Sequence, residues 1–271
     1  MITHFERLGP NVVPVALRFR EDDPGFLVLE ARAALAMSED YELEVTVEHP
    51  DSALRPADFL SRACDVAFPT DTTGLTIYCI VKRMRQIGLA TDGISRYVLV
   101  LVSPYWILTR FRDHRIRRDR TIGMLAADMT SKVAGLPPPV LDLAEEHEAK
   151  PYRVQYGERD HAYLMRSLSE EGIASYHDFL AGGALVLTDD TTLHRRTDVR
   201  VLPYAAPGAL AQHAEHVYEV SLDATQPFRS ARVRDYWFER PLFEAVAVSV
   251  GPEASGEGDL ERYEFVPGAG S

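Results

Sequence analysis

The residues best suited by type to do chemistry lie in the last third of the chain. His213 and His216 stand close to Glu215 and Glu219, and imidazole and carboxylate groups are common zinc ligands. Their spacing matches neither HExxH nor its inverted form, and spacing identifies no further ligand. A polar surface segment is therefore the default interpretation, and a metal site is the weaker one.

Two acidic pairs are the next candidates. Asp189 and Asp190 follow a predicted strand, but neighbouring residues of an extended chain point to opposite faces, so a turn explains them better than an acid-base pair. Glu170 and Glu171 read as the last exposed turn of a helix. No GxSxG, GxxxxGK[ST] or post-strand GxGxxG motif is present. We therefore assign no catalytic, cofactor-binding or metal-ligating residue.

Residues 110–120 are strongly basic. Their arginines alternate with the apolar residues Phe111 and Ile116, so the segment reads as a strand with one basic face. The net charge of −12 argues against a general nucleic-acid binder, and a salt-bridged contact between subunits is the favoured interpretation. Its arginines are Arg110, Arg112, Arg115, Arg117, Arg118 and Arg120, with Asp113 and Asp119 among them.

Length and composition bound the protein class. A chain of 271 residues can form one large domain or two smaller ones. Cys64 and Cys79 fit no metal-binding spacing, and reduced core residues are favoured over a disulfide. Residues 1–7 hold no apolar run, so we expect no signal peptide. The apolar stretch 97–108 is too short to span a bilayer, and we expect a soluble protein made in the cytosol.

The elements that would position these residues are mostly strands. Alternation, short apolar runs and turn signals predict strands over 13–19, 41–48, 64–68, 75–84, 96–102, 184–188, 197–202, 218–222, 229–233 and 243–250. Such spacing favours antiparallel barrels or sandwiches. A single helical turn is predicted at 58–60, and an amphipathic helix over 121–133. The Gly- and Ser-rich stretch 251–258 is expected to be mobile.

The chain is organised around residues 152–179. Tyr152, Val154 and Tyr156 alternate with polar residues, which is the period of a half-buried strand. Gly157 breaks the run, a helix follows, and Gly172 is placed to stop it before an extended segment at 174–179.

The string V-Q-Y-x-E-x-D that starts at Val154, followed by a helix ending in L-x-E-E-G-I, closely resembles the VgrG family. Those proteins are the trimeric spikes of bacterial type VI secretion systems and are related to phage tail-hub proteins. Other segments resemble the family in the right order: the strand ending in P-Y-W-I-L at 104–108, R-D-Y-W-F-E-R-P at 234–241, and Y-E-F-V-P-G at 263–268. Arg117 and Arg118 depart from the usual Phe-Gln.

The resemblance implies a mainly β fold with an α+β insertion, of the phage tail-hub type. A first small tube-like antiparallel β-barrel would occupy 1–103. An α/β insertion would occupy 104–190, with helices near 121–134 and 159–172. The remainder, 191–271, would form the second strand-rich barrel part, which can interleave with the insertion, and a mobile C-terminal end.

The resemblance also implies a structural protein with no enzymatic activity and no cofactor. It would form a homotrimer at the tip of an Hcp-like hexameric tube, with effector or adaptor proteins as further partners, no nucleic acid, and no membrane insertion by these residues. Assembly would occur in the cytoplasm and export would follow through the type VI machine.

Alternatives stay open at this stage. The hub of a phage-like tail or extracellular injection particle is the first, and a metal-dependent hydrolase using His213 and His216 is the second. The family continues into a small β-barrel and a β-helix needle, so the chain is either a hub fragment or a natural short form.

Overall fold

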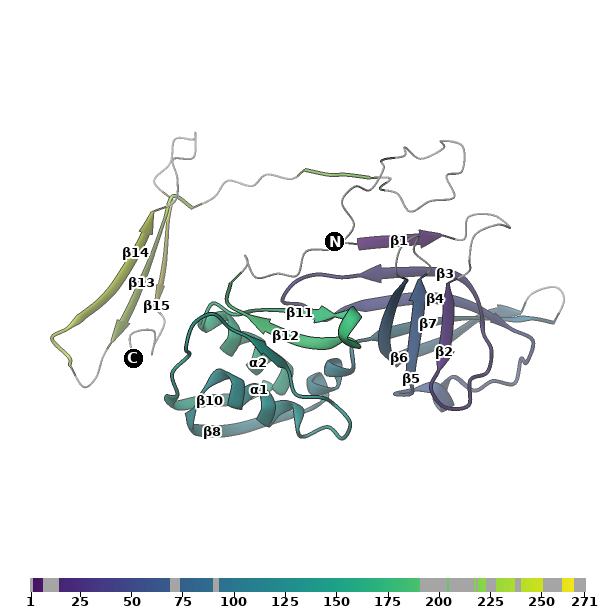
Figure 1. Cartoon of the computed structure of the whole chain (residues 1–271), viewed down its shortest axis with the longest axis horizontal. Helices are drawn as coiled ribbons and strands as arrows, with labels where there is room; N and C mark the ends of the chain where they lie inside the picture. The colour runs from purple at the N-terminus through teal and green to yellow at the C-terminus, as the bar shows by residue number, and fades with distance from the viewer. Residues whose placement is uncertain are drawn as a thin grey trace. The chain divides into compact units, whose positions relative to one another are not determined.

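The computed structural model describes residues 2–6, 15–68, 74–89, 93–190, 204, 217, 219–222, 228–236, 240–250 and 260–265. The chain divides into two compact units, Met1–Tyr218 and Glu219–Ser271. Strands predominate in both (Figure 1), which confirms the predicted mainly β fold class. Neither α-helix of the described part is long and apolar enough to cross a membrane.

The first unit begins with a seven-stranded antiparallel sheet in the order β1-β3-β4-β7-β6-β5-β2. The predicted strands at 41–48, 64–68, 75–84 and 96–102 are confirmed, and β1 and β3 were not predicted. A 3-10 turn, η1 (Pro56–Phe59), stands where a helical turn was expected. The strands are β1 (Ile2–Glu6), β2 (Ala16–Phe19), β3 (Leu27–Ala34), β4 (Glu42–His49), β5 (Ala63–Phe68), β6 (Leu75–Leu89) and β7 (Ser95–Val102).

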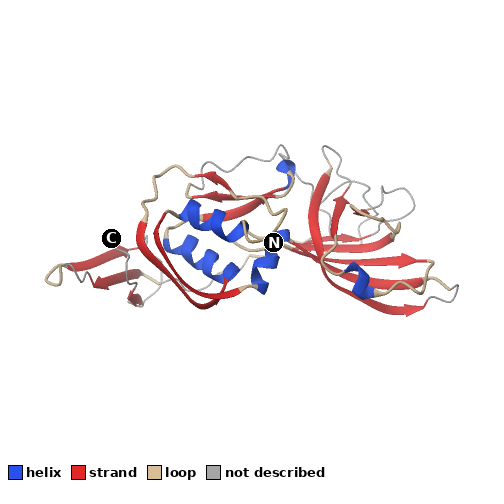
Figure 2. Cartoon of the chain, turned by 90° about the horizontal axis from the view of Figure 1, so that it is seen from below, coloured by secondary structure: helices blue, strands red, loops and turns tan. Residues whose placement is uncertain are grey.

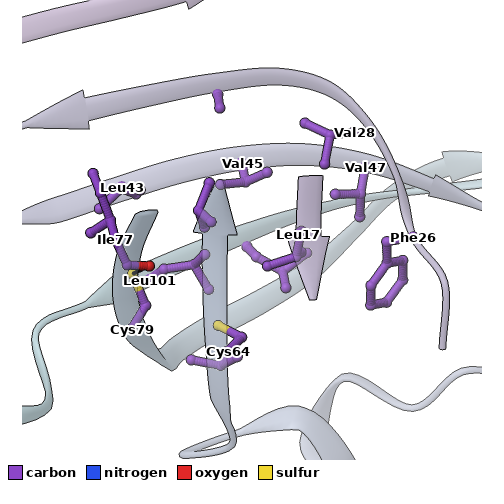
Figure 3. Packing of buried hydrophobic residues seen from close by; sticks show 14 of the residues in the cluster. Leu17, Phe26, Val28, Leu43, Val45, Val47, Cys64, Ile77, Cys79 and Leu101 are labelled. Carbon is purple, nitrogen blue, oxygen red and sulfur yellow. Dashed lines mark hydrogen bonds between the residues drawn. The ribbon is translucent and has the colours of Figure 1, made fainter. Parts of the chain in front are cut away.

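This sheet curls around its own core. β6 carries two register shifts, and β3 carries one, and such bulges increase local twist and bend a sheet. The strict alternation of β4 places Leu43, Val45 and Val47 inside with no exposed surface (Figure 3). Curling thus lets one sheet supply both sides of a hydrophobic core.

The two cysteines lie in that core. Cys64 and Cys79 face each other across β5 and β6, and both are buried free thiols, which confirms the prediction of reduced core residues. Burial raises the pKa of Cys64 to about 12 and that of Cys79 well above its usual range.

An α/β part follows in the same unit. A helix pair lies between a two-stranded ribbon, β8–β10, and a small sheet in the order β11-β12-β9 (Figures 1 and 2). The elements are η2 (Pro104–Arg110), β8 (Arg112–Arg120), α1 (Ile122–Thr130), β9 (Val140–Asp142), β10 (Lys150–Arg159), α2 (Asp160–Glu170), β11 (Ala174–Asp178), η3 (Phe179–Ala181) and β12 (Ala184–Thr188).

Local signals explain where these elements begin and end. The Thr121 side chain accepts a hydrogen bond from the backbone N–H of Met124 and caps α1, which ends at Thr130, short of the predicted 133. Gly172, with φ +70°, ends α2 as predicted. The prediction that Gly157 ends its strand is wrong. Gly157 has φ +62° and sits at a bulge inside β10, where a Cβ would lie 3.0 Å from the His114 ring.

The loop before β4 joins the curled sheet to the α/β part. Ser38 donates its backbone N–H to the Ser175 carbonyl at 2.7 Å. The Asp40 carboxylate lies 2.9 Å from Nε2 of His161 on α2 and 3.6 Å from Nε2 of His177 on β11. Burial acts to raise the pKa of Asp40, but the two imidazoles outweigh it and lower the pKa to about 2. We call this junction between the curled sheet and the α/β part the seam. One carboxylate, that of Asp40, contacts both α2 and β11 there.

The second unit contains a three-stranded sheet in the order β14-β13-β15. Its strands are β13 (Ser230–Tyr236), β14 (Glu244–Val250) and β15 (Glu261–Phe265), so the predictions at 229–233 and 243–250 are confirmed. Residues 219–222 are described without regular structure, so a strand over 218–222 is wrong for them. The segments 197–202 and 251–258 lie outside the described residues.

Core packing predicts a contrast between two leucines of neighbouring strands. Leu43→Ala should lower the free energy of unfolding by about 2–5 kcal/mol because it removes a fully buried side chain and leaves a cavity. The matched control Leu27→Ala, on a side chain that is 49% exposed, should cost less than about 1 kcal/mol. Urea unfolding of both variants measures the difference, and equal losses would contradict the assignment of the core.

The seam predicts an acid-sensitive contribution to stability. Because the pKa of Asp40 is lowered on folding, its stabilisation is complete above the unfolded value near 4 and is lost as pH falls toward about 2. Asp40→Asn should therefore cost about 2 kcal/mol at pH 6, and the loss should shrink toward pH 2. Unfolding curves across this range test it, with the exposed neighbour Glu39→Gln as control. A pH-independent loss in Asp40→Asn would overturn the ion-pair account.

Candidate functional site

The histidine candidates cannot be placed. His213, Glu215 and His216 lie outside the described residues, and Glu219 is an exposed residue in an irregular segment. Within the described ranges, no group of three or more His, Cys, Asp or Glu side chains is arranged to hold a metal ion.

Asp189 anchors a loop. Its carboxylate accepts the backbone N–H groups of Ala144 at 2.7 Å and Glu145 at 3.0 Å, and it lies 3.0 Å from Nε2 of His147. The Ala144 hydrogen bond is the largest of the effects that lower the pKa of Asp189, to about 2. A carboxylate held ionised in this way fastens residues 144–147 to the end of β12, and its oxygens are occupied.

The prediction that Glu170 and Glu171 form an exposed helix end is wrong for Glu171. Its side chain is 8% exposed and pairs with Arg153, while its second oxygen lies 3.2 Å from Nδ1 of His147. His147 is correspondingly half-buried, whereas Glu145, Glu146 and Glu148 are exposed, as expected for a solvated loop. Sequence reasoning missed this cluster because its members are 24 and 42 residues apart.

The β8–β10 ribbon has one polar side and one apolar side. The predicted alternation of residues 152–156 is confirmed, but the buried side is the polar one. Arg153, Gln155 and Arg117 face the helices and are at most 9% exposed; we call this side the inner face. We call the opposite side, made of His114, Ile116, Arg118, Tyr152, Val154 and Tyr156, the outer face.

The buried polar groups of the inner face form a continuous hydrogen-bonded network. The side-chain carbonyl of Gln155 accepts from Arg117 at 3.1 Å, and its amide donates to the buried carboxylate of Asp160 at 2.7 Å. Lys132 pairs with the other oxygen of Asp160, and the Arg117 guanidinium lies 5.3 Å from the Tyr163 ring centroid. Buried charges are tolerated when they are paired or hydrogen-bonded; here Asp160 is paired with Lys132, and Arg117 is hydrogen-bonded to Gln155.

The outer face exposes large apolar side chains. The exposed fractions are 65% for Ile116, 59% for Tyr152, 41% for Val154 and 81% for Tyr156. Val154 and Ile116 are directly opposed across the two strands, so the apolar groups form one strip. Tyrosine and arginine are enriched in protein interfaces, and a contiguous exposed apolar patch marks such a site. This surface is therefore the candidate functional site.

The arginines of residues 110–120 lie on both faces of the ribbon. β8 is a strand, as one interpretation predicted, but its basic residues do not share one face. Arg117 is buried, Arg115 pairs with Asp113 at 2.5 Å, and Arg120 lies 3.5 Å from Asp128 on α1. Arg118 points outward beside Tyr152.

The fold of this chain is shared with solved tail proteins. The tail protein from Neisseria meningitidis MC58 aligns with 94% of this chain and 71% of its own length at a TM-score of 0.60 and 13% identity. The E. coli c3393 protein, a type VI secretion component described as similar to the T4 tail proteins gp27 and gp5, aligns with 67% of this chain and 51% of its own length at a TM-score of 0.60 and 22% identity.

Residues 35–271 match the phage tail baseplate hub (GPD) family, and the chain belongs to that family. It is also 36% identical over 123 residues to the type VI secretion system spike protein VgrG5 of Pseudomonas aeruginosa. That alignment covers 44% of this chain and 15% of VgrG5, so the chain spans a small part of this relative. The resemblance inferred from the central signature is confirmed.

The inner face predicts unequal effects for two ribbon arginines. Arg153→Ala should lower the free energy of unfolding by about 3–5 kcal/mol because it leaves the buried Glu171 carboxylate without its main partner. Arg118→Ala, on the outer face, should change it by about 0.5 kcal/mol or less. Guanidinium unfolding provides the measurement, and a small effect of Arg153→Ala would contradict the network.

Proposed function

We propose that this chain is a structural hub component of a type VI secretion machine, which forms a homotrimer and docks on an Hcp-like hexameric tube. The observation that carries the proposal is the family match over residues 35–271. The similarity to a type VI spike protein and the fold shared with a type VI component support it.

The proposed division of the chain follows the resemblance. Residues 1–103 act as the first barrel, 104–190 as the insertion, and 191–271 as the second barrel part. A trimer of subunits that each carry two similar barrels presents six near-equivalent positions, and this is how a threefold object can cap a sixfold tube. The activity is adhesive and mechanical, without enzymatic chemistry or a cofactor.

The proposed partners and location follow from the same role. The hub assembles in the cytoplasm and leaves the cell through the type VI machine. Effector or adaptor proteins are further partners, and nucleic acid is not one, in keeping with a net charge of −12.

The hub of a phage-like tail is the second candidate. The Neisseria tail protein aligns with 94% of this chain, compared with 67% for the type VI component. The tube protein that the hub binds separates the two candidates.

Assembly tests the proposal. Light scattering coupled to size exclusion should give a trimer mass at high protein concentration, and immobilised chain should bind an Hcp-type hexamer better than a phage tail-tube protein. The reverse preference would support the phage-like candidate. A chain that stays monomeric and binds neither tube would overturn both.

A further inference from the structure

The outer face of the ribbon is an exposed surface that the fold itself does not explain. Val154, Ile116, Tyr152 and Tyr156 are exposed while Arg153 and Gln155 from the same strand are buried. A monomer that buried the apolar side instead would gain hydrophobic stabilisation and avoid desolvating the arginine. An exposed apolar strip of this kind marks a surface for binding another molecule.

The outer face also has a charge preference. Arg118 lies opposite Tyr152, and His114 lies opposite Tyr156, with the two rings of the latter pair in an edge-to-face contact at 5.2 Å. The partner of this strip should therefore combine apolar side chains with acidic ones.

The small sheet β11-β12-β9 of the same chain has a surface that combines apolar and acidic side chains. β9 pairs with β12 along one edge, and no described strand pairs with its other edge. Its residue Val140 is 50% exposed, whereas Leu141, the next residue of the strand, points to the opposite face and lies against Gly123 of α1. The exposed acidic residues Glu145, Glu146 and Glu148 follow it, and none of them forms an ion pair within the described ranges. We call β9 and residues 143–148 the acidic edge.

We propose that the outer face of one copy binds the acidic edge of a second copy. The apolar strip meets Val140, and Arg118 meets the glutamates of the loop. The ribbon and the β9 sheet lie on either side of the helix pair (Figures 1 and 2), so each copy offers two different surfaces. Such a contact is heterologous and can repeat by rotation until a ring closes. The proposal rests on the self-association proposed above and names the surfaces that make it.

Two variants, each with one surface altered, test the contact. Val154→Asp/Tyr156→Asp changes the outer face, and Glu145→Lys/Glu146→Lys changes the acidic edge. Each alone should weaken self-association by at least about 30-fold, as loss of central interface residues does. Ile87→Asp, at a 46% exposed apolar side chain of β6, is the matched control and should assemble like the wild type. Circular dichroism and thermal unfolding verify that every variant is folded.

Mixing the two variants gives the decisive result. Each retains one intact surface, so the mixture should form a one-to-one dimer by native mass spectrometry, and no larger ring. Assembly of either variant at wild-type concentrations overturns this inference and leaves the proposed trimer intact. Loss of assembly in the outer-face variant alone also overturns it, because the strip then binds itself or another surface. A wild type that never self-associates overturns this inference together with the proposed trimer.

Discussion

The buried ion pair between Arg153 and Glu171 is the constraint on which the α/β part depends. A guanidinium or carboxylate taken out of water costs several kcal/mol unless a partner meets it, so the end of α2 must lie against the ribbon. Gly172 permits the sharp turn that holds Glu171 there, and its second oxygen then reaches His147. Through His147 and Asp189 the same set of contacts continues to the end of β12. Ribbon, helix and small sheet are therefore joined by charges as well as by apolar packing.

That constraint also determines which surface is left for other molecules. Because the inner face must supply Arg117, Arg153 and Gln155 to the helices, the apolar residues of the same strands point outward. The polar half of the signature, Gln155 and Asp160, has a structural role inside the protein, since both belong to the buried network. The apolar half, Val154 and Tyr156, belongs to the exposed strip. One short motif thus contains both the buried residues that hold the ribbon against the helices and the exposed residues of the outer face. This suits a protein of the baseplate hub family.

The contacts of Asp40 at the seam join the α/β part to the curled sheet. A single carboxylate faces one imidazole from α2 and one from β11, so the loop before β4 is tied to both elements at once. Tyr41, the next residue, packs its ring 4.7 Å from that of His177. Charged and aromatic contacts at one loop therefore fasten the curled sheet to the α/β part. Two of the acidic residues considered in the sequence, Asp189 and Glu171, likewise anchor a loop and a helix end.

The sequence by itself determined the elements whose signals are local. The alternation of residues 41–48 predicted β4, Thr121 marked the start of α1, Gly172 marked the end of α2, and the signature at residues 154–173 predicted the family. It did not reveal β3, whose Ala-rich sequence also suits a helix, nor the short strand β9, which is defined by its partner β12. Only the tertiary structure decided that the ribbon buries Arg117 and Arg153 and exposes Tyr152 and Tyr156. A period of two shows which residues share a face, but the free energy of burying that face depends on what packs against it.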